Sequence, residues 1–206
     1  MDNFILFFQQ GGVFMYPIAL VLAAGLAIAL ERYFYLSKAK YTNSKAFNDL
    51  FPLLKAQDFK GAMQASNNSN ASLATMISSG ISRLAKGNRQ DVEYAMEECL
   101  MDTLPRLEKR TSYLQILANI ATLLGLLGTI FGLIDAFSSM AQVDVAKKAD
   151  MLSSSISQAM NTTAFGLISA IPLLFLHAIL QSKTAEIVDS IEQAGVRFLN
   201  IIPSNS

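Results

Sequence analysis

The sequence predicts an all-α membrane protein whose three transmembrane helices extend into a helical cytoplasmic domain. Of its 206 residues, 52% are hydrophobic and only 16% are charged, whereas about 25% of the residues of a soluble domain are charged. The charged residues also leave three long gaps, and each gap holds the roughly 20 apolar residues that a membrane-spanning helix needs. The gaps lie between Asp2 and Glu31, between Arg110 and Asp135, and between Asp150 and Lys183.

The distribution of Lys and Arg predicts how these helices are oriented. The first 31 residues contain neither, whereas twelve lie between Arg32 and Arg110. Because basic residues concentrate on the cytoplasmic side, the segment after the first span is expected to be cytoplasmic and both the N-terminus and the loop after span two external. The predicted spans are 14–35, 113–139 and 156–181, and between them and after them lie a cytoplasmic domain (36–112), an external loop (140–155) and a cytoplasmic C-terminal helix or tail (182–206).

The first 13 residues predict a short helix in the membrane interface. A signal peptide would begin with basic residues and end at a small-residue cleavage site, and the start of this chain has neither feature. Phe4, Ile5 and Phe8 supply apolar side chains before Gly11 and Gly12, which favour a break in the helix. The segment is therefore expected to lie on the membrane just before the first span.

The cytoplasmic segment has apolar residues at helical spacing in three stretches. The first two stretches are separated by a polar break at 66–72. The third begins near Val92 and runs through Leu104 and Leu107 toward span two without a glycine. It predicts one long helix that projects from the membrane, with a kink at Pro105, where a backbone hydrogen bond is missing.

Spans two and three each carry a row of small and weakly polar residues on one face. Such rows often only allow helices to approach closely, as in GxxxG pairs, and this reading applies to Gly125, Gly128, Gly132 and Gly166. Thr129 and Thr163, in contrast, lie at similar predicted depths, about 10 to 15 Å below the outer surface, and could form one hydroxyl layer along a pathway. The row of span two is Ala118, Thr122, Gly125, Thr129, Gly132 and Ala136, and that of span three is Ala159, Thr163, Gly166 and Ala170, with Gln158, Thr162 and Ser169 beside it.

Three other residues leave alternatives open. Asp135 is an intramembrane acid or merely reaches the lipid headgroups. His177 is a ligand or proton donor, or an amphipathic ring at the interface. Pro172 bends span three as a hinge or as fixed geometry. With only this histidine and the single cysteine Cys99, no metal site, disulfide or cofactor is expected, and a net charge of zero argues against nucleic acid as a partner.

Several strings of this sequence resemble, in order, the signatures of the MotA/TolQ/ExbB proton-channel family. The resemblance covers all three spans and their flanks, and three spans fit the ExbB or TolQ branch better than a flagellar MotA. In the cytoplasmic segment it extends only to helical character and length. The matching strings are Phe8-Gln9-Gln10-Gly11-Gly12, Met15-Tyr16-Pro17, Glu31-Arg32, Ile120 to Phe137 and Ile156 to Pro172.

This resemblance implies a subunit of an energy-transducing complex in a bacterial inner membrane, with a periplasmic N-terminus. Family members form a pentamer whose second and third spans line a pore. The pore holds two copies of a single-span ExbD- or TolR-like subunit, which brings the aspartate that is protonated. Proton passage drives a TonB- or TolA-like protein. The resemblance places Thr129 and Thr163 opposite that aspartate, with Thr122, Thr162 and Gln158 in the ion pathway.

Two departures from the family pattern affect the mechanism. Gln158 stands where ExbB and TolQ typically have a glutamate, and a neutral amide cannot change its protonation in the physiological range. Thr122 replaces the family's proline and adds a hydroxyl to the same face of the span. A sodium-driven variant, in which hydroxyl oxygens coordinate the ion, is therefore an alternative.

Two other classes of function, a membrane scaffold and an enzyme, make different demands on the sequence. A non-conducting membrane scaffold would use the long cytoplasmic helices to bind another envelope machine, and ion flux would distinguish it from a channel. An enzyme is not expected, because an aspartyl protease needs two acids at one depth and Asp135 has no neighbour there, while His177 is far from the polar layer. The acidic residues of the cytoplasmic segment predict a solvated face. They are Asp91, Glu93, Glu97, Glu98 and Asp102.

Overall fold

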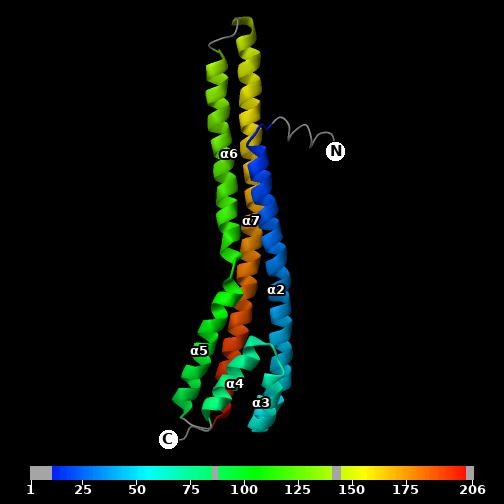
Figure 1. Ribbon diagram of the computed structural model, residues 1–206, viewed down its shortest axis with the longest axis vertical. Coiled ribbons are helices and arrows are strands. Elements are labelled where there is room, and N and C mark those ends of the chain that lie inside the picture. Colours follow the sequence, from blue (N-terminus) through cyan, green and yellow to red (C-terminus); the bar gives the residue numbers. More distant parts are fainter. Residues whose placement is uncertain (1–10, 85–87, 141–144, 203–206) are drawn as a thin grey trace. The chain divides into compact units, whose positions relative to one another are not determined.

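The computed structural model describes residues 11–84, 88–140 and 145–202. All regular secondary structure in these ranges is helical (Figure 1). This confirms the predicted all-α class. The helices are α2 (Met15–Lys55), α3 (Phe59–Asn67), α4 (Ser72–Leu84), α5 (Arg89–Glu108), α6 (Thr111–Met140) and α7 (Val145–Ile201).

Three helical stretches are long and apolar enough to cross a membrane, as the sequence predicted. They are Met15–Lys55, Arg89–Met140 and Lys148–Ile201, and each contains one of the predicted spans. The orientation of these helices relative to the two sides of the membrane stays a prediction. The predicted interfacial helix falls mostly on residues 1–10, outside the described residues.

The chain divides into two compact units. Unit 1 comprises Met1–Glu31 and Arg110–Ile179, and unit 2 comprises Arg32–Lys109 and Leu180–Ser206. Both α2 and α7 therefore contribute their first part to unit 1 and their second part to unit 2. Unit 1 contains the most apolar part of each long helix, whereas unit 2 contains α3, α4 and α5 entirely.

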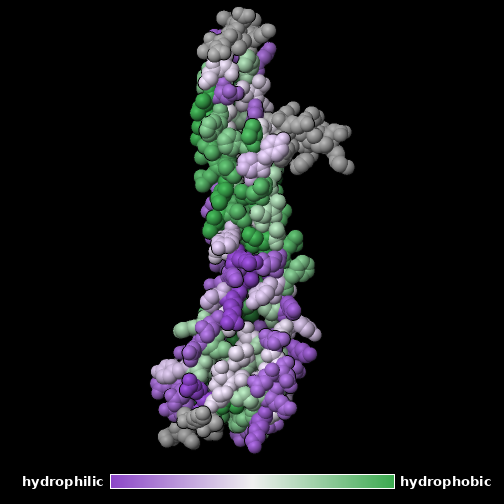
Figure 2. Space-filling view, viewed as in Figure 1, coloured by the Kyte–Doolittle hydropathy of each residue, from purple (hydrophilic) through white to green (hydrophobic). Residues whose placement is uncertain are grey.

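The surface of unit 1 is strongly apolar. Figure 2 shows an almost continuous hydrophobic band over much of α6, all of which belongs to this unit. Large side chains such as Leu123, Phe131 and Phe175 are more than half exposed. A soluble protein rarely exposes a contiguous apolar patch of this kind. A surface of this composition fits contact with lipid or with other membrane helices.

Unit 2 has a conventional core in which α4 packs against α5 and α7. Leu73, Ile77, Met96 and Phe198 are each at most 4% exposed. Gly80 makes this close packing possible, because a Cβ there would lie 2.9 Å from the Phe198 ring and 3.0 Å from the Met96 sulfur. The apolar residues predicted at helical spacing in this segment therefore meet in one core.

Polar groups fix where the short helices of unit 2 begin. The Asp58 carboxylate accepts a hydrogen bond from the Gly61 backbone N–H at the start of α3. Asn88 and Asp91 form a reciprocal capping box at the start of α5. These bonds satisfy backbone N–H groups that have no partner within the first turn of a helix.

Two features differ from the sequence-based expectations. The predicted continuous helix is interrupted after α5, because Lys109 is extended and Arg110 adopts a φ of 65°. Pro105 lies inside α5, and the interruption comes four residues later. The predicted loop 140–155 is already helical from Val145, since residues 145–155 contain no glycine or proline to interrupt a helix.

The buried Asn43 of α2 links two helices of unit 2. Its amide nitrogen donates to the Ala39 carbonyl at 2.9 Å, and its amide oxygen accepts from the Leu73 backbone N–H in the first turn of α4 at 2.8 Å. The Asn43 side chain is 3% exposed. Water therefore cannot replace it as a partner for Leu73.

We predict that Asn43→Leu destabilises unit 2 by about 1–3 kcal/mol, the cost of leaving a buried donor unpaired. The midpoint of thermal unfolding of the purified protein, followed by circular dichroism, should fall. Asn48→Leu is the matched control because Asn48 lies exposed on the same helix, and its midpoint should stay unchanged. Equal midpoints for the two variants would contradict this role of Asn43.

Candidate ion pathway between the second and third spans

A close contact between backbone atoms joins α6 and α7 of unit 1 at two glycines. A Cβ on Gly166 would lie 2.8 Å from the Ala121 carbonyl oxygen and 3.0 Å from the Gly125 Cα. A Cβ on Gly125 would lie 3.3 Å from the Cα atoms of both Gly166 and Thr163. Since these neighbours are backbone atoms, they cannot move aside cheaply, and glycine is required for the helices to approach this closely.

Thr163 ties the same two helices together. Its hydroxyl donates to the Gly125 carbonyl oxygen of α6 at 2.9 Å, and its side chain is partly exposed. Because the Gly125 carbonyl oxygen lies within a helix, one of its lone pairs serves the backbone hydrogen bond of α6. The Thr163 hydroxyl donates to the other lone pair of this oxygen. The predicted pathway residue Thr163 is therefore also a packing residue, placed at the edge of the contact between α6 and α7.

Two other predicted pathway residues lie on α6 and bond to their own helix. The Thr129 hydroxyl donates to the Leu126 carbonyl at 2.6 Å, and the Thr122 hydroxyl donates to the Ala118 carbonyl at 3.1 Å. Thr129 is partly exposed and Thr122 is exposed. Each hydroxyl proton thus points to a backbone carbonyl, which leaves the oxygen lone pairs as the groups offered to a neighbour.

Thr162 is buried between α7, α6 and the segment before α2. Its side chain is 2% exposed, and its hydroxyl lies 2.6 Å from the Gly11 carbonyl oxygen and 3.0 Å from the Gln158 carbonyl oxygen. Its methyl group also packs where a Cβ on Gly128 would be. Within one protomer this residue therefore holds the segment before α2 against α7 and α6, and its role in an ion pathway stays a prediction.

The segment before α2 is the part of the site that sequence reasoning missed. Gly12 has a φ of 74°, and its missing Cβ leaves room for the Gln158 side chain. The rings of Phe14 and Phe131 stack with their centroids 5.4 Å apart. The only signal in the sequence was the glycine pair, which indicates a break in a helix but does not identify what packs against it. Gln158 itself is exposed.

The remaining predicted packing residues differ in their surroundings. Gly132 lies against span three, since a Cβ there would be 3.0 Å from the Ala159 Cβ. Pro172 is exposed within α7, which continues on both sides of it. Asp135 is exposed near the end of α6, and His177 is partly exposed in α7. The structure therefore does not bring these two titratable residues into the contact between Gly125 and Gly166.

Charged residues gather where α2 and α6 leave the apolar part of unit 1. Arg110, which directly precedes α6, donates to Glu31 of α2 at 2.9 Å. Both side chains are about half exposed, so the pair contributes little stability by itself. The Arg110–Glu31 pair matters more for geometry. It accompanies the positive φ of Arg110 and joins the end of one predicted span to the start of another.

The polar side chains on the second and third spans present oxygen atoms but carry no charge. The partly exposed hydroxyls of Thr129 and Thr163, together with the exposed Thr122 and Gln158, provide polar groups along apolar helices. Among the described residues, no three His, Cys, Asp or Glu side chains are placed to hold a metal ion. Such a surface can stabilise a passing proton carrier or cation by hydrogen bonds and dipoles, but it contains no acid that could take up the proton.

Comparisons with known proteins agree with the resemblance read from the sequence. The sequence model of the MotA/TolQ/ExbB proton channel family matches residues 68–193 of this chain. An ExbB-like biopolymer transport protein of Synechocystis is 26% identical over 84% of this chain and 83% of its own length. The biopolymer transport protein ExbB of Pseudomonas putida is 21% identical over 75% of this chain, and the Tol-Pal system protein TolQ of Haemophilus influenzae is 29% identical over 57%. The matches span about half the length of these last two proteins.

We predict that Gly166→Val separates α6 from α7 and costs about 1–3 kcal/mol, as overpacking usually does. The yield of folded protein from membranes and its resistance to protease in detergent should both fall. Ala164→Val is the control, because Ala164 is exposed on the same helix and a larger side chain there meets no backbone. If both variants resist protease like the parent protein, the contact does not limit the packing of these helices.

Proposed function

Because this chain belongs to the MotA/TolQ/ExbB proton channel family, in its ExbB/TolQ-like branch, we propose that it is a subunit of an inner-membrane motor driven by the proton motive force. Five copies would surround two copies of an ExbD/TolR-like single-span subunit. The complex would convert proton passage into mechanical work on a TonB- or TolA-like protein. Such a role is that of a transport-associated channel protein, and no enzymatic activity is proposed.

The proposed topology follows the apolar helices and the basic residues. The parts of α2, α6 and α7 within unit 1 would cross the inner membrane, with residues 1–13 and 140–155 in the periplasm. Unit 2 would lie in the cytoplasm with the C-terminus. The apolar surface of unit 1 supports this division, and so does the excess of Lys and Arg between the first two spans.

One observation carries the proposed mechanism: the second and third spans present hydroxyl groups but no acid at their closest contact. No Asp or Glu lies between residues 111 and 134 or between 151 and 182. Gln158 cannot titrate where the family typically has a glutamate. We call the surface formed by these hydroxyl groups the hydroxyl wall. A proton pathway along the hydroxyl wall needs its titratable group from another subunit, and a single-span partner that carries an aspartate would supply it.

The direction of the hydroxyl protons in the hydroxyl wall indicates which protonation state of that aspartate it would favour. Since Thr163 donates to Gly125 and Thr129 donates to Leu126, their oxygens are left as acceptors. An acceptor favours the protonated acid, which donates a hydrogen bond, over the ionised carboxylate. Stabilising the carboxylate would require a hydroxyl to turn away from its carbonyl. The threonines would thus ease protonation of the partner's aspartate while it faces them.

Oxygen acceptors would also suit a sodium ion, which is the alternative coupling ion for this site. Hydroxyl and carbonyl oxygens are the ligands that hard cations prefer, and the loss of a titratable side chain at Gln158 removes one reason to expect protons. Proton and sodium flux measured separately through the same reconstituted complex decides between the two ions. A non-conducting scaffold predicts neither flux.

We predict that Thr163→Val lowers ion flux through this chain reconstituted with its single-span partner by about ten-fold, which corresponds to a barrier about 1.4 kcal/mol higher. Valine has nearly the shape of threonine but cannot accept or donate a hydrogen bond. Thr163→Ser keeps the hydroxyl and should retain most of the flux. The measurement is the rate of dye-reported ion uptake into vesicles under an imposed gradient.

The matched control is Thr42→Val. Thr42 is likewise a partly exposed threonine whose hydroxyl donates to a backbone carbonyl, in this case that of Lys38 in its own helix. Because Thr42 lies on α2 in unit 2, its loss should leave the flux unchanged. Full flux through Thr163→Val, in a complex of normal composition, would remove Thr163 from the mechanism.

A further inference from the structure

The second part of α2 carries a basic stripe on one side of the helix. We define this stripe as Phe34, Lys38, Tyr41 and Lys45, whose spacing of four, three and four residues places them on one face. Phe34 and Tyr41 are 69% and 73% exposed, and both lysines are exposed as well. The stripe alternates an aromatic ring with a positive charge, and the exposed Asp49 follows Lys45 by one helical turn on the same face.

The helix α5 carries a stripe of opposite charge. We define this acidic stripe as Glu93, Tyr94, Glu97 and Met101, which also share one side of the helix. Tyr94 and Met101 are 59% and 69% exposed. Both glutamates are exposed too. Large apolar side chains again lie beside the charges, so the two stripes are complementary in charge and similar in composition.

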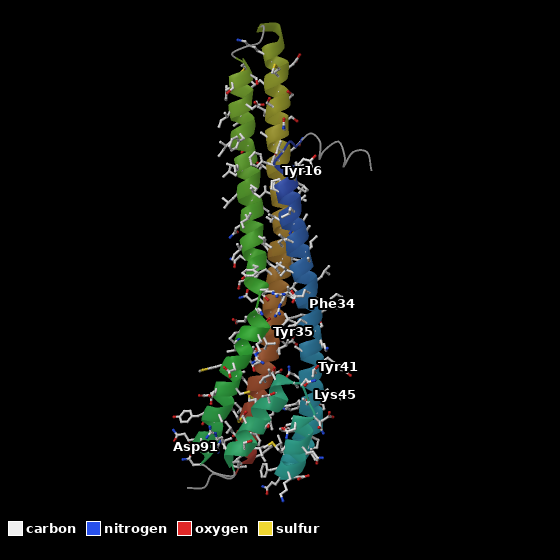
Figure 3. The ribbon with its side chains drawn as sticks, viewed as in Figure 1. Tyr16, Phe34, Tyr35, Tyr41, Lys45 and Asp91 are labelled. Carbon is white, nitrogen blue, oxygen red and sulfur yellow. The ribbon has the colours of Figure 1, made fainter. Side chains whose placement is uncertain are left out.

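The charged residues of the two stripes form no ion pair within the described part of the protomer, although Tyr94 accepts a hydrogen bond from Gln90 and the Phe34 ring packs edge-on against Tyr33. The ion pairs found among the described residues are Lys40 with Glu186 and Arg110 with Glu31, and these involve none of the stripe residues. In unit 2, α2 and α5 lie on opposite sides of the bundle (Figure 1). Figure 3 accordingly shows Phe34, Tyr41 and Lys45 along α2, and Asp91 at the start of α5 on the other side.

We infer that the partner of each stripe is a second copy of this chain: the basic stripe of one protomer docks against the acidic stripe of the next. Complementary surfaces on opposite sides of one molecule produce a head-to-tail contact, which closes into a ring when the rotation allows it. A two-fold contact would instead place each stripe against itself, and like charges across an interface repel. The charge pattern therefore selects the ring.

The structure also sets which residues meet. The Arg32 side chain donates to the Leu107 backbone carbonyl, so these two residues lie at a similar level of unit 2. From this level, α2 toward Lys55 and α5 toward Arg89 extend the same way along the bundle of unit 2 (Figure 1). Lys45 follows Arg32 by 13 positions and Glu93 precedes Leu107 by 14, each about 20 Å along its helix.

Copies related by a rotation axis keep each residue at one level along that axis. A ring whose axis runs along α2 and α5 of unit 2 therefore matches residues at equal levels of these helices. Lys45 of one copy then meets Glu93 of its neighbour, with Glu97 one helical turn away. The inference rests on the proposed function only in requiring an oligomer, and it identifies the cytoplasmic surfaces that join the subunits.

Cysteine crosslinking of the whole complex in its own membrane tests this contact. The variant Lys45→Cys with Glu93→Cys is made in a Cys99→Ala background and treated with a short bis-maleimide. Cys99 is a poor nucleophile in any case, because burial and the Asp102 charge raise the pKa of its thiol. The double variant should give a ladder of covalent multimers that ends at the size of the ring, whereas each single variant should stay monomeric.

The control pair is Lys60→Cys with Glu93→Cys, because Lys60 lies exposed on α3, outside both stripes, and should give no ladder. Efficient crosslinking of Lys45→Cys alone would show a two-fold contact and overturn the inference. So would the absence of a ladder from the double variant in a complex that native mass spectrometry shows to be oligomeric. A monomer in that spectrum would instead count against the proposed assembly itself.

A charge exchange provides a second readout. Lys45→Glu places like charges at the contact and should lower the assembled fraction at low salt about five-fold, with a smaller effect at 1 M salt because of screening. Adding Glu93→Lys and Glu97→Lys should restore assembly. Failure of these two changes to rescue Lys45→Glu would contradict the pairing.

Discussion

The contact between Gly125 and Gly166 is the constraint on which the rest of unit 1 depends. Only glycine at both positions lets α6 and α7 approach until backbone atoms touch, and this approach brings the Thr163 hydroxyl to the Gly125 carbonyl. The same closeness sets Gly128 against Thr162, which in turn holds Gly11. The hydroxyl wall, the packing of the two spans and the anchoring of the segment before α2 thus follow from one backbone contact.

The charged residues lie away from the uncharged hydroxyl wall. The apolar parts of the spans lack acids at the helix contact, while the ionised residues lie at their ends and in unit 2. Arg110 and Glu31 mark one such end, and the two stripes of unit 2 give the protomer a basic side and an acidic side. In this account the intramembrane surface provides hydrogen-bonding oxygens, a partner provides the acid, and the cytoplasmic charges arrange the copies.

The helical class and the three apolar helices could be predicted from the sequence, because charge gaps and helical spacing are local signals. The burial of Thr162 could not, since its partner Gly11 is 151 residues away and belongs to a segment whose glycines indicate only a break. The interruption at Arg110 was also missed. A positive φ at a residue other than glycine has no clear sequence signal, and here it accompanies an ion pair with a residue 79 positions earlier.

The central claim, that the pathway acid comes from another subunit, is tested most directly by native mass spectrometry of the complex released gently from its own membrane. The account predicts several copies of this chain, five by the family pattern, together with two copies of a small single-span subunit that carries an aspartate in its span. An oligomer of this chain without any such subunit, reproduced in several detergents, would contradict the claim, because the hydroxyl wall would then lack its acid.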